Sequence, residues 1–201
     1  NAYVLEDDYL SELGSTGKPL APLKAMDRDD RIIYLKSFSK IFMPGLRLAF
    51  LNMPAHLPQR LLHVKHLTDI STSGLTQRVF DLYLRDGSWQ KHIAGIRRVY
   101  QTQCDFTCRR TSELLGDTVH WQKPAGGLSL WLRLPPRLDA PTLTQAAAQT
   151  NLLLTDGTAF YPRPVDHHHI RISFATLSLQ QIETGLGILA HLTAAHPGIT
   201  P

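Results

Sequence analysis

The sequence predicts an α/β fold in two lobes, and three observations support that prediction. Short apolar segments typical of strands alternate with longer segments in which apolar residues recur every three or four positions, as on one face of a helix. The longest helical segment, residues 89–115, lies between two groups of strands and divides the chain into residues 1–88 and 89–201. The 201 residues are 43% hydrophobic and 19% charged, which suffices for one substantial core or for two small domains.

The first lobe is predicted to contain three strands followed by two helices. Residues 3–5 and 32–35 are rich in aromatic and β-branched side chains, which strands favour. A Met-Pro-Gly turn precedes a further apolar segment at 46–51, the third predicted strand. Apolar residues with helical spacing predict helices over 57–70 and 74–84, and the Asp-Gly pair after the second is a typical stop signal.

The second lobe begins with the long helix, which Gly116 ends. Beyond it, short segments with apolar and polar residues in alternation predict strands, and two segments with helical spacing predict helices. Asp139 is the predicted N-cap of the first of these helices, and Ser178 with Gln181 resembles a capping box at the start of the second. The predicted elements are strands at 119–121, 128–134, 152–154 and 170–174, a helix at 143–148 and a closing helix at 178–191.

Composition excludes several classes of protein. No apolar run approaches the roughly 18–20 residues that a membrane span needs, and the N-terminus lacks the basic-then-apolar pattern of a signal peptide. Two cysteines are too few to cross-link a secreted scaffold of this size, so we expect a reducing, cytoplasmic compartment. Cys104 and Cys108 have neither redox nor zinc spacing, so we expect them to be partly buried free thiols. The net charge of +4 hints at nucleic acid, but the basic residues are spread along the chain, which weakens that interpretation.

A lysine and its neighbours form the first candidate site. Lys40 lies just after the strand predicted at 32–35, next to the hydroxyl residues Ser37 and Ser39. A primary amine in such a place can form a Schiff base with a carbonyl compound, although an exposed loop lysine is the plain alternative. Arg47 follows and, together with the two serines, could bind a phosphate through its forked guanidinium.

Three further residues lie at or within predicted strands. Asp7 ends the opening strand, at the edge where α/β sheets place their sites, and its carboxylate can pair with a ring nitrogen. Tyr9 offers a phenol to the same ligand. Arg171 lies in the strand predicted at 170–174 with apolar neighbours on both sides, so it needs a carboxylate partner. A salt bridge in the core and a bound ligand explain Arg171 equally well.

Together these residues match one family in order and spacing. The chain resembles the pyridoxal-phosphate-dependent aminotransferases of fold type I, and its motifs are most similar to the aminotransferase-like domain of MocR-type members of the GntR regulator family. The resemblance covers nearly all of residues 3–195. It rests on five segments: EDDY at 6–9, SFSK at 37–40, PGLR at 44–47, PAGG at 124–127 and RISFA at 171–175.

The resemblance implies that the first lobe binds pyridoxal 5′-phosphate. Lys40 corresponds to the catalytic lysine that bonds to the cofactor. Asp7 corresponds to the aspartate paired with the pyridine nitrogen, which keeps the ring an electron sink. Tyr9 corresponds to the tyrosine near the phenolic oxygen of the cofactor.

The resemblance also indicates which residues bind the cofactor phosphate and which bind the substrate. Arg47 and the two serines correspond to the group that binds the cofactor phosphate, and Arg171 to the arginine that binds the α-carboxylate of the substrate. The glycines at 126–127 correspond to a place where the backbone closely approaches the substrate. At 156–157 the chain has Asp-Gly where the family often has Pro-Gly, so we expect the loop opposite the substrate to differ.

The resemblance further implies a division into domains. Residues 1–88 correspond to the C-terminal part of the large-domain sheet that binds the cofactor, and residues 89–201 to the long helix and a small α/β domain. The N-terminal half of that fold, with its phosphate loop and its ring-stacking aromatic residue, is not among the 201 residues. We therefore expect this piece alone to bind cofactor weakly and to be inactive. We also expect an exposed apolar face on the sheet and on the helices over 57–85, and self-association through it.

Three functions of the parent protein stay open. The EDDY motif favours a transcription regulator whose aminotransferase-like domain binds pyridoxal phosphate and an amino-acid or amine effector. Such a regulator is expected to be a homodimer that meets DNA only through an upstream winged-helix domain. The alternative is a free-standing aminotransferase in which Lys40 moves the Cα proton. The third is a degenerate domain used for dimerisation or scaffolding.

No metal site is expected. Residues 166–169 are Asp-His-His-His, but three consecutive histidines cannot all point at one ion from a regular strand. His63 and His66 lie three residues apart on a predicted helix, without a third ligand nearby in sequence. Surface positions explain both groups better than metal binding does.

Overall fold

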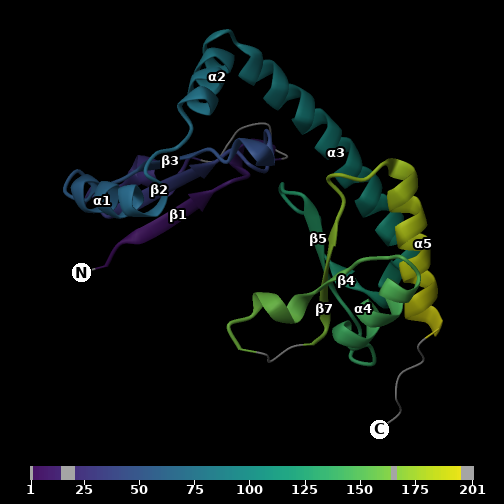
Figure 1. Cartoon of the computed structure of the whole chain (residues 1–201). Helices are drawn as coiled ribbons and strands as arrows, with labels where there is room; N and C mark the ends of the chain where they lie inside the picture. The colour runs from purple at the N-terminus through teal and green to yellow at the C-terminus, as the bar shows by residue number, and fades with distance from the viewer. Residues whose placement is uncertain (1, 15–20, 164–166, 196–201) are drawn as a thin grey trace. The chain divides into compact units, whose positions relative to one another are not determined.

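The computed structural model describes residues 2–14, 21–163 and 167–195, and their contacts divide the chain into two compact units, Asn1–Arg98 and Val99–Pro201 (Figure 1). The boundary falls within the long helix α3 (Ser88–Leu115). The assignment of residues 1–88 to a cofactor-binding domain and of 89–201 to a small domain stays a prediction. In the described part of the chain, no helix is both long and apolar enough to cross a membrane.

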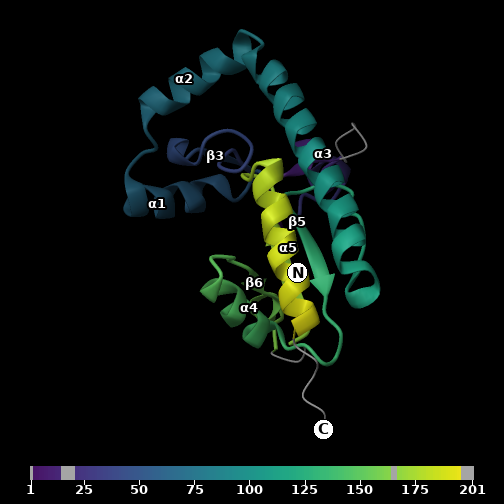
Figure 2. The same cartoon turned by 90° about the vertical axis from the view of Figure 1, so that its right-hand side faces the viewer.

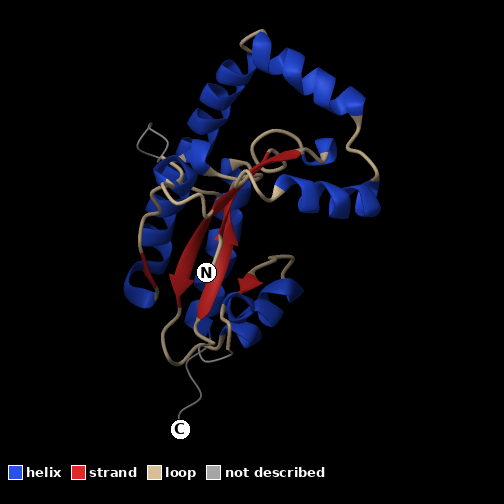
Figure 3. Ribbon diagram, turned by 90° about the vertical axis from the view of Figure 1, so that its left-hand side faces the viewer, coloured by secondary structure: helices blue, strands red, loops and turns tan. Residues whose placement is uncertain are grey.

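Unit 1 contains a three-stranded sheet and two helices ahead of α3 (Figure 3). The strands lie in the order β1-β2-β3; β1 and β2 are parallel, and β3 is antiparallel to β2. Both predicted helices are confirmed to within one residue at each end. The elements are β1 (Val4–Asp8), β2 (Ile32–Ser37), β3 (Ala49–Asn52), α1 (Pro58–Asp69) and α2 (Gly74–Arg85).

Strand boundaries in unit 1 differ from the prediction: β2 continues two residues beyond position 35, to Ser37, and the end of the first strand and the start of the third are also wrong. The opening strand extends to Asp8, because every residue from Val4 onward pairs with β2 up to the Asp8–Lys36 pair. The third strand begins at Ala49 rather than at position 46. A short 3₁₀ turn ends just before Arg47, whose left-handed backbone (φ 50°, ψ 41°) is incompatible with a strand.

An aromatic cluster forms the core of unit 1. It holds the segment after β2 against α2 and the start of α3. The ring centroids of Phe38 and Phe80 lie 4.5 Å apart, and those of Phe38 and Trp89 lie 5.7 Å apart. Phe42 contacts Phe80 and Trp89 as well. Such ring pairs add to the stability gained from apolar burial, so the segment after β2 is firmly positioned.

Much of the apolar surface of unit 1 is exposed, as expected from the sequence. Helix α1 has no buried residue, and its Leu62 and Leu67 are 63% and 73% exposed. Ile70, Leu75 and Leu5 are comparably exposed. Exposed apolar patches of this kind favour contact with another surface. Self-association through this face stays a prediction.

Unit 2 packs an antiparallel sheet against helices (Figures 1 and 2). The strand order is β4-β5-β7-β6. Alternate residues of β5 and β7, among them Leu130, Leu132 and Ile170, form the core with α5 and the C-terminal part of α3. The elements after α3 are β4 (His120–Trp121), β5 (Ser129–Arg133), α4 (Ala140–Gln149), β6 (Thr155–Asp156), β7 (His169–Ser173) and α5 (Leu179–Ala195). The α/β class is confirmed.

Both predicted helix caps in unit 2 are confirmed. The Asp139 carboxylate accepts a backbone N–H of the first turn of α4 at 2.9 Å. Ser178 Oγ accepts the Gln181 N–H at 3.2 Å, and Gln181 Oε1 accepts the Ser178 N–H at 2.8 Å, which completes the capping box. Helix α4 starts before the predicted position 143, because Pro141 is well suited to a first helical turn.

The strand predicted at 152–154 is wrong. Pairing with β7 starts only at Thr155, opposite Arg171. The first and last of the three leucines pack against the core, whereas Leu153 is 88% exposed. The apolar run therefore serves packing after α4 and not strand pairing.

Candidate functional site

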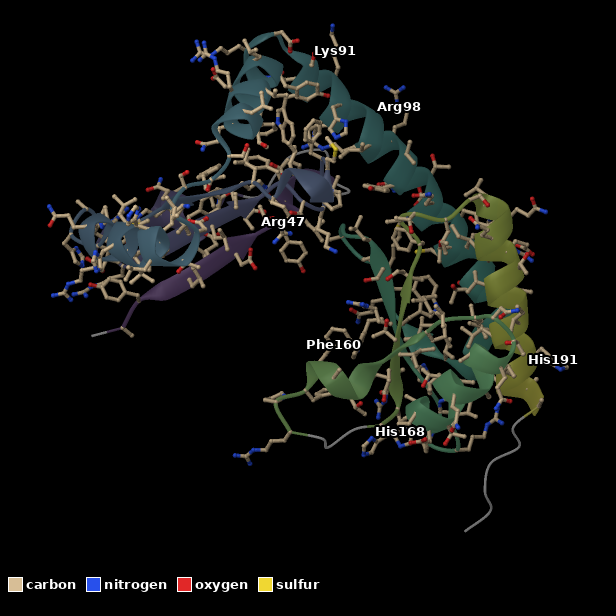
Figure 4. All side chains as sticks on the ribbon, in the orientation of Figure 1. Arg47, Lys91, Arg98, Phe160, His168 and His191 are labelled. Carbon is tan, nitrogen blue, oxygen red and sulfur yellow. The ribbon has the colours of Figure 1, made fainter. Side chains whose placement is uncertain are left out.

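One edge of the unit 1 sheet collects the predicted residues of the first lobe. Because β1 and β2 are parallel, the strand ends with Asp7 and Ser37 lie at the same edge. Because β3 is antiparallel to β2, with Ser37 opposite Ala49, the chain enters β3 at that edge, just after Arg47 (Figure 4). Segments distant in sequence thereby bring a carboxylate, two hydroxyls, an amine and a guanidinium to one edge.

The turn after β2 presents Lys40 at the surface. Phe38 and Ile41 on either side of it are buried, with 8% and 2% of their surface exposed. The imidazole of His92 donates from Nε2 to the Ile41 carbonyl at 2.7 Å, which fixes the turn to α3. Ser39 is half-buried, and Lys40 is exposed. The buried neighbours hold the backbone, and the lysine side chain stays accessible.

Two lysines at this strand end differ in environment. Lys40 makes no ion pair with any residue that the structure describes. Lys36 is 4% exposed, and its Nζ lies 3.1 Å from Asp8 Oδ2 and 2.5 Å from Glu12 Oε2. Lys36 was not among the residues predicted from the sequence; its signal is a lysine inside an apolar strand, a place where lysines are rare unless paired. Lys36 is therefore engaged within the protein, and Lys40 is open to a ligand.

The hydroxyl and guanidinium groups at the edge suit an anion. Ser37 Oγ accepts the Ser39 N–H at 3.4 Å, which shapes a tight turn with both hydroxyls near the strand end. Arg47 is exposed, and its N–H donates to the Pro44 carbonyl at 3.3 Å. Its left-handed backbone is uncommon for an arginine, and conformations of this kind cluster at functional sites.

Asp7 and Asp8 lie on opposite faces of the sheet, since successive residues of a strand alternate. Asp7 is exposed, on the face that Ser37 shares. Asp8 accepts the Tyr34 hydroxyl at 2.6 Å and the Ser11 hydroxyl at 2.7 Å. Burial alone would raise the pKa of Asp8, but hydrogen bonds to its carboxylate outweigh burial and lower the pKa to about 2. Asp7 is thus the carboxylate available to a ligand.

The chemistry of this edge fits pyridoxal phosphate. Arg47 and the two serine hydroxyls can donate to a phosphate, the Lys40 amine can bond to an aldehyde, and Asp7 can accept a proton from a ring nitrogen. None of these three charged residues forms an ion pair within residues 2–14, 21–163 and 167–195. Tyr9, 44% exposed, adds a phenol just beyond β1. The carboxylate, the amine and the guanidinium are therefore all accessible to a bound ligand.

Arg171 lies on the face of the unit 2 sheet that is turned away from the core. Its register neighbours are Trp131 on β5 and Thr155 on β6, and Nη2 donates to Thr155 Oγ1 at 3.4 Å. The guanidinium carbon lies 4.8 Å from the centroid of the Phe160 ring (Figure 4). Arg171 Nε is buried and has no hydrogen-bond partner among the described residues. No described carboxylate pairs with Arg171, and whether a ligand or a core salt bridge engages it stays open.

Glycine occurs at two positions of unit 2 for different structural reasons. Gly127 has a φ of +100°, which explains glycine there, and no described atom beyond its two chain neighbours lies within 4 Å of the place of a Cβ. The predicted close approach to substrate at 126–127 stays a prediction. A Cβ on Gly157 would lie 2.4 Å from the His169 carbonyl oxygen. The close backbone approach within unit 2 is therefore at Gly157, where β6 meets β7.

Metal and thiol chemistry have no support in the described residues. No group of histidine, cysteine, aspartate and glutamate there could hold a metal ion. Asp166 of the Asp-His-His-His run lies outside the described residues. Cys104 and Cys108 are buried and free, as expected, and burial raises the pKa of Cys108 to about 12.

The chain is similar to enzymes and to regulators. A family model described as aminotransferase class I and II matches residues 1–189. Aromatic-amino-acid aminotransferase 1 of Thermococcus litoralis is 30% identical over 187 residues, covering 93% of this chain and 45% of that protein. The uncharacterized HTH-type transcriptional regulator YisV of Bacillus subtilis is 32% identical over 183 residues, covering 91% of this chain and 37% of the regulator.

A solved structure shows the same fold. The kynurenine aminotransferase of Pyrococcus horikoshii superposes with a TM-score of 0.92 at 30% identity, covering 98% of this chain and 49% of that one. The chain spans less than half the length of each of these three relatives.

Proposed function

Because this chain belongs to the aminotransferase class I and II family, which depends on pyridoxal phosphate, we propose that it holds this cofactor at the β1-β2-β3 edge of unit 1. One observation supports the site most strongly. Asp7, Lys40 and Arg47 come from three segments to one sheet edge, and none of them is paired with a described residue. Unpaired charges gathered at a strand-end edge favour a charged ligand.

Each residue of the edge has a distinct task in this proposal. When bound, pyridoxal phosphate withdraws electrons from the Cα of an attached amino compound. Lys40 supplies the amine that bonds to the cofactor and the base that takes the Cα proton on Nζ. Asp7 keeps the ring nitrogen protonated by pairing with it. Arg47 and the hydroxyls of Ser37 and Ser39 bind the phosphate, and Tyr9 donates to the phenolic oxygen.

Arg171 binds the α-carboxylate of the amino compound in this proposal. A guanidinium can donate two parallel hydrogen bonds to a carboxylate, and the buried Nε of Arg171 has a donor to spare. The Phe160 ring supports the guanidinium plane from one side. A carboxylate at this position would favour amino acids over simple amines.

For the whole protein, we favour an effector domain of a MocR-type transcription regulator of the GntR family. The EDDY motif and the similarity to the YisV regulator support this role. The similarity to aromatic-amino-acid aminotransferase 1 supports the alternative, a free-standing aminotransferase. In either role the protein acts in the cytoplasm as a homodimer. The coding sequence upstream of residue 1 discriminates between them, since a basic winged-helix segment there supports the regulator and its absence the enzyme.

The cofactor proposal is tested by titrating the chain with pyridoxal phosphate and following absorbance in the visible range. We expect a Lys40-dependent band that grows only well above micromolar cofactor, because we expect weak binding by this chain alone. The band should be lost in Lys40→Ala and retained in Lys65→Ala, which removes an exposed lysine paired with Asp69 on α1. An equal band in the Lys40→Ala variant would overturn the proposal.

A further inference from the structure

A buried cluster of charged and hydroxyl groups lies on the opposite face of the sheet from Asp7. Its centre is the Lys36 ammonium, whose three N–H donors have three acceptors. Nζ lies 3.1 Å from Asp8 Oδ2, 2.5 Å from Glu12 Oε2 and 3.1 Å from Ser11 Oγ. Tyr34 completes this Lys36 cluster by donating its hydroxyl to Asp8 at 2.6 Å.

The cluster joins three segments of unit 1. Lys36 and Asp8 are the last register pair between β2 and β1, so their ion pair ties the two strands together at their ends. Ser11 donates its backbone N–H to Asp8 at 3.0 Å, and Arg97 of α3 donates to the Glu12 carbonyl. The loop after β1 is thereby held to its own strand, to β2 and to α3.

The cluster is internally satisfied, so it is not itself a ligand site. The Asp8 carboxylate accepts from Tyr34, from Ser11 and from Lys36. Burial and the bond to Asp8 both raise the pKa of Tyr34, which keeps this phenol a donor. A buried ammonium with two carboxylates, all hydrogen-bonded, favours a single arrangement of the groups around it.

The residues fixed by the cluster are the chain neighbours of the proposed cofactor ligands. Asp8 stands between Asp7 and Tyr9, and Lys36 directly precedes Ser37. Because side chains alternate across a strand, holding one residue on the rear face sets the direction of its neighbours on the front face. A small error in the placement of such groups is costly to the chemistry they perform.

We propose that Lys36, held between Asp8 and Glu12, is a positioning residue of the cofactor site. It fixes the strand end with Asp7 and Tyr9 relative to the strand end with Ser37 and Lys40. The inference rests on the proposed function, because positioning has a chemical purpose only if this edge holds the cofactor. It adds Lys36 and Glu12, which take no part in binding the ligand, to the residues that the site needs.

Two measurements on the full chain test the inference. The first is hydrogen exchange at the Ser11 and Leu13 amides, which are bonded to Asp8 and to the Leu10 carbonyl. The second is borohydride reduction in the presence of pyridoxal phosphate, followed by peptide mass analysis. The labelling of Lys40 is expressed relative to that of Lys65, an exposed lysine on α1 that serves as an internal reference.

The variant Lys36→Met keeps the length of the side chain and removes its charge. We expect it to speed exchange at the two loop amides by about tenfold or more and to lower the Lys40-to-Lys65 labelling ratio by about fivefold or more. Lys36→Arg, which keeps the positive charge, should restore much of the slow amide exchange and much of the wild-type labelling ratio. Lys24→Met, which removes a lysine paired with Asp27 on the same unit, should change neither. General destabilisation would raise the labelling of Lys40 and Lys65 together and leave their ratio near its wild-type value.

The outcomes are distinct. A folded Lys36→Met variant with the wild-type labelling ratio would overturn the inference. Should Lys36→Met fail to fold, Glu12→Gln provides the same comparison, because it leaves the Lys36–Asp8 pair in place. If wild-type Lys40 is labelled no more than Lys65, the proposed function fails and the inference about the cofactor site falls with it. Faster loop exchange in that case would show only that the cluster stabilises unit 1.

Discussion

Replacing Gly157 by alanine should destabilise unit 2 through one identifiable clash. A Cβ at this position would lie 2.4 Å from the His169 carbonyl oxygen and 2.8 Å from the carbonyl carbon. Since ordinary contacts begin near 3.4 Å, the two backbones must separate by about 1 Å. Gly157 does not have a positive φ, so the backbone conformation itself tolerates alanine and the change isolates the steric effect.

The contacts around Gly157 set the expected loss of unfolding free energy. Separation at Gly157 displaces β6, whose pairing with β7 consists of Thr155 with Arg171 and Asp156 with Ile170. Overpacking of a well-packed site costs about 1–3 kcal/mol, and weakened strand hydrogen bonds add about 1 kcal/mol. We expect Gly157→Ala to lower the free energy of unfolding by about 2–4 kcal/mol, as the sum of these two effects.

Urea unfolding followed by circular dichroism measures the loss, as a lower midpoint at unchanged slope. The matched control is Gly187→Ala in α5, where no described atom outside the helix's own backbone and the two adjacent residues lies within 4 Å of the place of a Cβ. Alanine in a helix interior should stabilise the protein by up to about 1 kcal/mol, the opposite sign. If Gly157→Ala loses less than about 0.5 kcal/mol, the size of an ordinary surface substitution, the inferred clash is wrong.

Three further predictions concern charged groups and thiols. The pKa of Asp8 is lowered from 3.8 to about 2, so the stability that its charge contributes is present above pH 4 and is lost as the pH falls toward 2. The difference in unfolding free energy between wild type and Asp8→Asn should shrink over that interval, and a constant difference would contradict the assignment. Arg171→Lys should weaken binding of pyruvate, a simple α-keto acid, by about tenfold or more in an NMR titration, since a lysine cannot donate in parallel; unchanged affinity would remove Arg171 from the site. Iodoacetamide at pH 8 should leave Cys104 and Cys108 unmodified until urea is added, because burial raises both pKa values; full labelling of the native chain would refute their burial.

The pattern of strands and helices was largely predictable, because apolar periodicity reflects the faces that pack. The errors arose where a local conformation or a packing role overrode that pattern. Arg47 delays β3 because its backbone is left-handed, which no residue type signals except glycine and asparagine. The leucines at 152–154 look like a strand but fill space beside the core.

The residue types of the candidate site were predictable, but which of two like residues faces the ligand and which is paired within the protein was not. Asp7 and Asp8 are alike in sequence, and only the strand register assigns one to each face. Lys36 and Lys40 likewise differ in burial, which depends on the ion pairs of Lys36 with Asp8 on the neighbouring strand and with Glu12 just beyond that strand. Long-range pairings of this kind leave little trace in a single sequence.

An NMR titration of the isotopically labelled chain with pyridoxal phosphate shows directly whether the β1-β2-β3 edge of unit 1 holds the cofactor. We expect the largest backbone shifts on three segments at one sheet edge: residues 7–9, residues 37–40 and Arg47. The Lys40→Ala variant should lose the shifts that depend on the covalent bond and keep weaker ones at the phosphate group. Shifts scattered over the exposed lysines, or centred in unit 2, would contradict the claim that this edge holds the cofactor.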